Sequence, residues 1–165
     1  MSLIFGPHKN LTKKSALIED SEFGDEMAEL SEAMLALMSA LGGVGLAGVQ
    51  IGIPKRIIVA NVGEGNIVLI NPVIKSVSDE ESELEEGCLS FPLKTFRIKR
   101  PSEVTVNFRL PDGRESEETF SGMEAAVVQH EIDHLDGITV FSKVSRLKRD
   151  LYSRKFKKFR RNIGK

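Results

Sequence analysis

The residues best suited to chemistry form the segment His130-Glu131-Ile132-Asp133-His134, which has the pattern H-E-x-x-H. On a helix, residues four apart lie on one face, so the two histidine side chains can reach a single metal ion. Glu131 then stands beside that ion, where a general base would act on water. Taken alone, the pattern is typical of zinc proteases.

A catalytic metal site of this kind needs a third protein ligand, with a further position left for water. In one protease class a glutamate downstream of the box supplies the ligand, but no glutamate follows His134 in this chain. In another class a histidine stands six residues after the box, where this chain has Val140. The remaining histidine, His8, lies in an irregular N-terminal stretch. A metalloprotease therefore lacks its third ligand here.

The only cysteine, Cys88, is the remaining candidate for the third ligand. A single cysteine excludes an intramolecular disulfide and is typical of a chain in a reducing compartment. One thiolate with two imidazoles is a suitable ligand set for Fe²⁺, Zn²⁺, Co²⁺ or Ni²⁺. By residue type alone, a buried and inert thiol is favoured over a ligand or nucleophile.

Apolar periodicity indicates the elements that must position these residues. Steps of three and four predict a helix over residues 25–41, which ends at Gly42-Gly43. The acidic segment 79–86 carries six carboxylates and is interpreted as a solvated loop. Strands are predicted at residues 56–62, 67–71, 73–77, 104–110 and 115–120, the last two joined by a Pro-Asp-Gly turn.

The H-E-x-x-H box lies in a further predicted helix. Ser121 and Glu124 have the spacing of a capping box at its start, and Gly137 can end it after Leu135. Because strands precede this buried helix, we expect an α+β fold. Mixed or antiparallel sheets would pack around a central metal-binding helix, with an N-terminal helix and a basic C-terminal helix beside them.

Length and composition predict one domain over residues 1–165. The chain has 165 residues, 41% of them hydrophobic and 28% charged, and no linker divides it. Its net charge of -1 predicts no general attraction to nucleic acid. Residues 145–165 are expected to form the basic helix. A broken apolar stripe on this helix would consist of Leu147, Leu151, Phe156, Phe159 and Ile163.

Three segments in order make the sequence similar to peptide deformylases, which remove the formyl group from the N-terminal methionine of new polypeptides. They are GVGLAGVQ at residues 43–50, EGCLS at residues 86–90 and the H-E-x-x-H box itself. The resemblance covers roughly residues 25–142 and is weaker at both ends. Departures at Gly48, at Leu93 and in residues 7–11 affect neither a ligand nor the glutamate of the box.

The resemblance implies a role for each site residue. Cys88, His130 and His134 would hold the metal, Glu131 would act as general base and acid, and Gln50 with the Leu89 N–H would stabilise the oxyanion. Asp133 is expected to pair with Arg100, either in support of the site or as a surface salt bridge. The residues implied in substrate binding are Gly43, Val44, Gly45, Leu84, Gly87, Ala126 and Val127. Without the resemblance, the glycines are interpreted as turn residues and the apolar residues as ordinary core residues.

The resemblance also implies a cofactor and partners. Fe²⁺ would be the metal in the cell, with Zn²⁺, Ni²⁺ or Co²⁺ able to replace it, and the substrates would be N-formylmethionyl peptides of nascent chains. The basic C-terminal helix is either a solvated face or a contact with ribosomal RNA. We expect a monomer in the cytoplasm, of bacterial type, with an organellar or viral origin left open. No apolar run approaches the roughly 18 residues of a membrane helix.

A protein that binds metal only for stability is the alternative from another class. Such a protein would need neither Glu131 nor Gln50, since a purely structural site is complete with its ligands alone. Both residues are present in the segments that carry the resemblance. The sequence therefore favours an enzyme.

Overall fold

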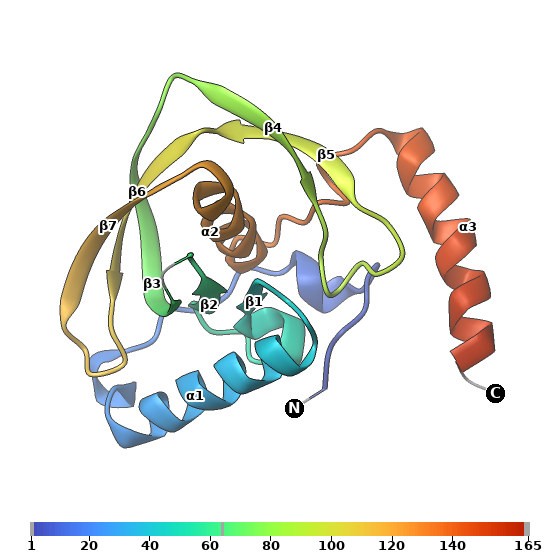
Figure 1. Cartoon of the computed structure of the whole chain (residues 1–165). Helices are drawn as coiled ribbons and strands as arrows, with labels where there is room; N and C mark the ends of the chain where they lie inside the picture. Colours follow the sequence, from blue (N-terminus) through green and yellow to red (C-terminus); the bar gives the residue numbers. More distant parts are fainter. Residues whose placement is uncertain (1, 64, 164–165) are drawn as a thin grey trace.

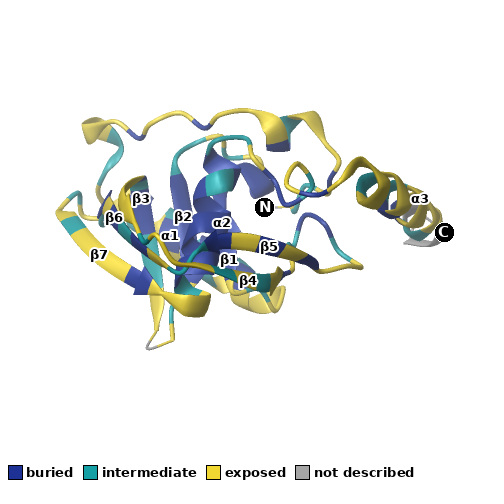
Figure 2. Ribbon diagram, turned by 90° about the horizontal axis from the view of Figure 1, so that it is seen from above, coloured by how far each residue is buried: buried dark blue, intermediate teal, exposed yellow. Residues whose placement is uncertain are grey.

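A buried helix, α2 (Gly122–Leu135), lies at the centre of the fold, with strands on several sides of it (Figure 1). The computed structural model describes residues 2–63 and 65–163. Ten residues of α2 are buried, and both histidines and the glutamate of the box are among them (Figure 2). A helix covered this completely must present its polar side chains to one another or to polar groups of its neighbours.

The larger sheet has five antiparallel strands in the order β1-β2-β3-β6-β7. The predicted hairpin is confirmed, with Val104 on β6 opposite Phe120 on β7. Apolar side chains from the inner face of this sheet, including Ile58 and Val106, form one core cluster with Val128 and Leu135 of α2. The strands are β1 (Gly45–Ala47), β2 (Ile57–Asn61), β3 (Asn66–Val77), β6 (Glu103–Arg109) and β7 (Glu115–Ser121).

Strand β3 is continuous where two strands were predicted, and it is irregular in its middle. Its register against β6 shifts between Ile70 and Val73. At this shift Asn71 adopts a φ of 52°, a conformation that asparagine tolerates better than most residues. The Asn71 side chain accepts from the Ile18 N–H at 2.9 Å and donates to the Ile18 carbonyl at 2.8 Å. The irregularity therefore fixes the N-terminal segment to the sheet.

The predicted acidic loop is wrong, because this segment forms strand β4 (Glu81–Glu86). It pairs with β5 (Phe96–Pro101), which the apolar pattern did not reveal. Along β4 the exposed acids alternate with half-buried residues, and the basic side chains of β5 lie opposite. Glu81, for example, forms an ion pair with Lys99 at 2.5 Å. Cross-strand charge pairing explains how so acidic a segment can form a strand.

The helix predicted over residues 25–41 is confirmed as α1 (Asp25–Ala40). Its methionines fill a core cluster: Met27, Met34 and Met38 are buried against Leu46 of β1 and Ile57 of β2. Three short 3-10 helices complete the N-terminal half, η1 (Lys9–Thr12), η2 (Asp20–Glu22) and η3 (Gly48–Ile51).

Helix α2 begins and ends close to the predicted positions, but its start lacks the predicted capping box. The Ser121 side chain makes no capping hydrogen bond. Gly122 follows with a φ of 56°, and its N–H donates to the Ser102 carbonyl at 2.8 Å. This backbone bond holds the start of α2 against the connection between β5 and β6. After Leu135, Gly137 has a φ of 74° and ends the helix as predicted.

Helix α3 (Arg146–Ile163) lies at one side of the molecule, beyond the β4–β5 pair (Figure 1). Gly164 and Lys165, and the side chain of Ile163, lie outside the described part of the structure. The predicted apolar stripe is wrong for Leu147 and Leu151, which are 69% and 52% exposed. The prediction is right for Phe156, which is buried, and for Phe159, which packs against the same apolar cluster. Tyr152, which was not predicted, is buried beside Phe156, and both lie more than 90° around the helix from Leu147. Among the described residues, no helix has the length and apolar character needed to cross a membrane.

Candidate metal centre

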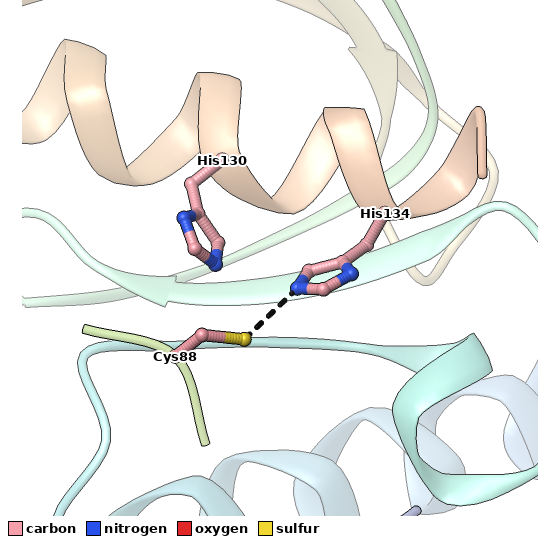
Figure 3. A group of neighbouring side chains, drawn as sticks. All are labelled: Cys88, His130 and His134. Carbon is pink, nitrogen blue, oxygen red and sulfur yellow. Dashed lines mark hydrogen bonds between the residues drawn. The ribbon is translucent and has the colours of Figure 1, made fainter. Parts of the chain in front are cut away.

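The three predicted metal ligands lie together. His130 and His134 project from the same face of α2, and Cys88 approaches them from the loop that follows β4 (Figure 3). The Cys88 Sγ atom lies 3.3 Å from His134 Nε2. One ligand atom of each residue lies within 4.8 Å of the others. Residues separated by 42 to 46 positions in the chain thus form one cluster of donors.

This cluster fits a divalent metal ion. Bonds of about 2.0–2.3 Å to nitrogen and sulfur place the donors of one tetrahedral ion about 3–4 Å apart. His134 is fully buried, and burial lowers the pKa of its imidazole well below the usual value. A neutral imidazole is the form that binds metal. The three donors leave a fourth position of a tetrahedral site for water or substrate.

The alternative third ligands of a metalloprotease do not reach this cluster. Val140, at the position of the third protease histidine, is buried in an apolar cluster with Phe91 and Tyr152. His8 caps η1, where its Nδ1 accepts from the Asn10 N–H at 3.2 Å. The geometry thus agrees with Cys88 as the third ligand.

A buried ion-pair network orients His130. Glu86, the last residue of β4, lies 2.8 Å from His130 Nδ1 and receives two hydrogen bonds from the Arg100 guanidinium. Burial raises the pKa of Glu86, but the bonds from His130 and Arg100 outweigh it and bring the pKa down to about 2. An ionised Glu86 must accept, so Nδ1 carries a proton. Burial lowers the pKa of His130, but its bonds to Cys88 and Glu86 outweigh this and raise the pKa well above the usual value, so a metal ion would displace a proton when it binds at Nε2.

The expected pairing of Asp133 with Arg100 is present as part of the same network. Arg100 Nη1 donates to Asp133 at 2.7 Å, and Lys143 contacts the same carboxylate at 3.0 Å. Arg100 is 5% exposed, so the contact is no ordinary surface salt bridge. The role of Glu86 was missed in the sequence, where it counted only as one acid among six. Its position two residues before Cys88 is a signal that could have identified it.

Glu131 lies at the wall of a cavity next to the ligand cluster. Its side chain is buried, and Oε2 has no hydrogen-bond partner within residues 2–63 and 65–163. Burial raises the pKa of this carboxyl group to about 7. Gly45 of β1 lies directly against it, and a Cβ atom there would collide with the Glu131 carboxylate. Glycine at position 45 therefore leaves room for the carboxylate.

Gln50 directs an N–H group toward Cys88, and Leu89 is the next residue in the chain after that cysteine. Gln50 Oε1 accepts from the Ala47 N–H at 2.8 Å, which fixes the orientation of the amide. Its Nε2 then donates to Ser90 Oγ at 3.1 Å and lies 3.7 Å from Cys88 Sγ. Leu89 lines the same cavity, and its N–H donates to no acceptor in the described chain.

The cavity has a volume of about 350 Å³ and is bounded mainly by the loop before β1, the Cys88 loop and the start of α2. Among the predicted substrate-binding residues, Leu84 is half-buried on β4 and is not part of the lining. Met123 was missed, although it shares a face of α2 with Ala126, Val127 and His130 by helical spacing. The predicted residues that do line the cavity are Gly43, Val44, Gly45, Gly87, Ala126 and Val127.

Comparison with known proteins gives one consistent result. A family model described as polypeptide deformylase matches residues 2–150. A peptide deformylase of Agrobacterium fabrum is 42% identical over 161 residues, which cover 94% of each chain. A second, from Thermodesulfovibrio yellowstonii, is 42% identical over 158 residues, which cover 92% of this chain and 93% of the relative.

Solved structures of similar proteins share the whole fold. A crystal structure of peptide deformylase from Ehrlichia chaffeensis superposes with a TM-score of 0.92 at 34% identity, covering 99% of this chain and 98% of that one. A peptide deformylase from Legionella pneumophila also gives a TM-score of 0.92, at 35% identity, covering 99% of this chain and 97% of the other.

Replacing the central carboxylate of the network tests its role in orienting His130. Glu86→Gln leaves the buried Arg100 with Asp133 as its remaining anionic partner, so we expect a loss of about 3 kcal/mol in the free energy of unfolding, the lower end of the range for breaking a buried ion pair. The metal affinity should fall by about 10–100-fold, because His130 loses the partner that fixes its tautomer. Urea denaturation and competition with a chelator measure the two effects.

Glu83→Gln is the matched control, since Glu83 lies on the same strand with its side chain 57% exposed. It should leave metal affinity unchanged. Equal metal affinities for the two variants would show that Glu86 does not orient His130.

Proposed function

Because the chain belongs to the polypeptide deformylase family, whose members remove the formyl group from N-terminal formylmethionine, we propose that Cys88, His130 and His134 hold its catalytic metal ion. The observation that carries the proposal is the convergence of three donor atoms within 4.8 Å beside a buried, unpaired carboxylate oxygen. The reaction is hydrolysis of a formamide, which needs an activated water, a place for oxyanion charge and a proton for the leaving amine.

Glu131 is the residue that moves the proton. A bound divalent ion supplies Lewis acidity and lowers the pKa of water from about 16 toward about 7. Glu131 is no ligand and keeps Oε2 without a partner in the described chain, so its carboxylate is available to a water in the cavity. It accepts the proton from that water and then delivers it to the departing nitrogen.

Gln50 and Leu89 provide the donors for the oxyanion. The Ala47 N–H holds Gln50 Oε1, so the amide turns its Nε2 toward Cys88 rather than away from it. The free Leu89 N–H lies on the next residue after the cysteine. Donors that are fixed before the reaction stabilise developing charge without a cost of reorganisation.

The cavity fits the methionine side chain of the substrate. Its apolar part is formed by Val44, Met123, Ala126 and Val127, and its polar part by Glu131 and two of the proposed ligands, Cys88 and His130. Gly43, Gly45 and Gly87 expose backbone along the cavity, where a peptide can approach closely. An unbranched thioether buried here would place the formyl group at the polar end.

Substitution of the proton carrier separates catalysis from metal binding. Glu131→Ala should reduce the release of free amine from a formyl-Met peptide by about 10²–10⁴-fold. It should leave the metal content unchanged, because Glu131 is not a ligand. The assay uses Fe²⁺-loaded protein under anaerobic conditions, and metal analysis accompanies each measurement.

Cys88→Ser serves as the comparison, because loss of the thiolate should lower both metal content and activity. Retained turnover in Glu131→Ala would contradict the proposed role of the carboxylate. Loss of metal from Glu131→Ala would show that Glu131 supports the structure of the metal site.

We propose Fe²⁺ as the metal in the cell, with Zn²⁺, Ni²⁺ or Co²⁺ able to replace it. A thiolate with two imidazoles accepts each of these ions, and Cys88 is only partly buried at the edge of the cavity. We therefore expect the Fe²⁺ protein to lose activity in air, with oxidation of Cys88 detectable by mass spectrometry. Full activity of an air-exposed Zn²⁺ protein would contradict the preference for iron.

We propose that α3 contacts ribosomal RNA. Among residues 146–163 there are nine basic side chains and one acid, Asp150. The helix lies at one side of the molecule (Figure 2), and most of its basic residues are exposed. Lysine and arginine bind phosphates with a strong dependence on salt. We propose a cytoplasmic location of the bacterial type, and a monomer suffices because one chain supplies every site residue.

Charge reversal on α3 tests the ribosome contact. The triple variant Lys148→Glu, Arg154→Glu and Lys158→Glu should abolish salt-sensitive cosedimentation with ribosomes, because phosphate attraction becomes repulsion. The control variant carries three lysine-to-glutamate changes at Lys9, Lys13 and Lys14, which are exposed near the N-terminus. It should leave cosedimentation unchanged. If the α3 variant binds like the unmodified protein, the helix is a solvated face only.

A further inference from the structure

Tyr152 of α3 is buried in the apolar cluster against which Cys88 packs. It is 2% exposed and is one of the largest fully buried side chains of the described chain. Its ring centroid lies 5.4 Å from that of Phe141, 5.7 Å from that of Phe156 and 6.0 Å from that of Phe91. Tyr152 thus joins α3 to an aromatic cluster formed by distant parts of the chain.

The same cluster supports the loop that carries Cys88. The Phe91 N–H donates to the Cys88 carbonyl at 2.9 Å and closes a tight turn over residues 88–91. The Phe91 ring stacks on Phe141 at 5.2 Å and leans against Tyr152. Cys88 itself packs against this apolar cluster. The turn therefore rests on rings that come from the chain after α2.

The three ligands differ in what holds them. His130 and His134 are part of a helix with continuous backbone hydrogen bonds, and Glu86 orients one of them. Cys88 lies between β4 and β5 in a segment without regular structure. Besides the aromatic cluster, two hydrogen bonds hold this segment. The Gly6 N–H donates to the Ser90 carbonyl at 2.7 Å, and Gln50 Nε2 donates to Ser90 Oγ.

We propose that Tyr152 is a positioning residue for Cys88. The Tyr152 ring holds the turn of residues 88–91 in the place where the Cys88 thiolate can share a metal ion with His130 and His134. The inference rests on the metal site proposed above. The family model matches residues 2–150 and so ends before Tyr152. The helix that carries the proposed ribosome contact is thereby also a support of the metal centre.

The ring, rather than the hydroxyl group, provides this support. Tyr152 Oη is buried and has no hydrogen-bond partner in the described chain. Burial raises the pKa of the phenol above its usual range, so the group stays neutral. A phenylalanine keeps the same ring contacts and removes an unpaired polar atom. The variants Tyr152→Phe and Tyr152→Ala therefore separate the two parts of the side chain.

Cobalt provides a readout that does not depend on activity. The full-length protein is loaded with Co²⁺, and the thiolate-to-cobalt charge-transfer absorption reports the bond to Cys88. The rate of Co²⁺ release to a chelator is measured below the unfolding temperature of every variant. Tyr152→Ala should weaken the absorption and release the ion about 10–100-fold faster. Tyr152→Phe should match the unmodified protein.

Leu151→Ala is the matched control, because it shortens an exposed side chain on the same helix. It should leave both readouts unchanged. If the unmodified protein shows no thiolate-to-cobalt band, the proposed metal site itself is wrong.

Two further outcomes overturn the inference while the metal site stands. In the first, Tyr152→Ala unfolds at a lower temperature but keeps the band and the release rate, so the ring only stabilises the fold. In the second, Tyr152→Phe releases Co²⁺ as fast as Tyr152→Ala, so the effect belongs to the hydroxyl group. If Tyr152→Ala does not fold, Tyr152→Leu, which keeps an apolar side chain, is measured in its place with the same expectations.

Discussion

The buried carboxylate of Glu86 is the interaction on which the arrangement of the site depends. One side chain joins the end of β4 to Arg100 on β5 and to His130 on α2, so it connects the small sheet to the central helix. A buried ion pair adds little net stability, because desolvation offsets most of the attraction. Its contribution here is orientation, since it determines which nitrogen of His130 faces the other ligands. The same contacts bring the loop that carries Cys88 close to the helix.

Helix α2 must satisfy two demands that usually conflict. It is the core of the fold, with Val128 and Leu135 packed against the larger sheet, and it also carries three polar groups of the site. The periodicity of the helix separates the two functions, because apolar residues occupy one side and the box faces Cys88. The two-stranded sheet covers the helix on a further side (Figure 1).

Local patterns in the sequence predicted the parts of the fold that local interactions determine. Helix α1, the hairpin of β6 with β7 and the extent of α2 all follow from periodicity and turn residues. Strand β4 could not be predicted in this way, because its acids become compatible with a sheet only when Lys99 and Arg97 lie opposite. The burial of Tyr152 could not be predicted locally either, because it depends on ring contacts with Phe91 and Phe141, which are distant in the sequence. The proposed ligands could be named from the sequence because the motifs that carry them are short and contiguous.

The close contact between Gly45 and Glu131 has a consequence for reading the sequences of relatives. Any side chain at this position would occupy the space of the carboxylate, so it would have to displace the group that carries the proton. A relative that keeps the histidine box but has a larger residue in place of this glycine is therefore a candidate for a protein that binds metal without turnover.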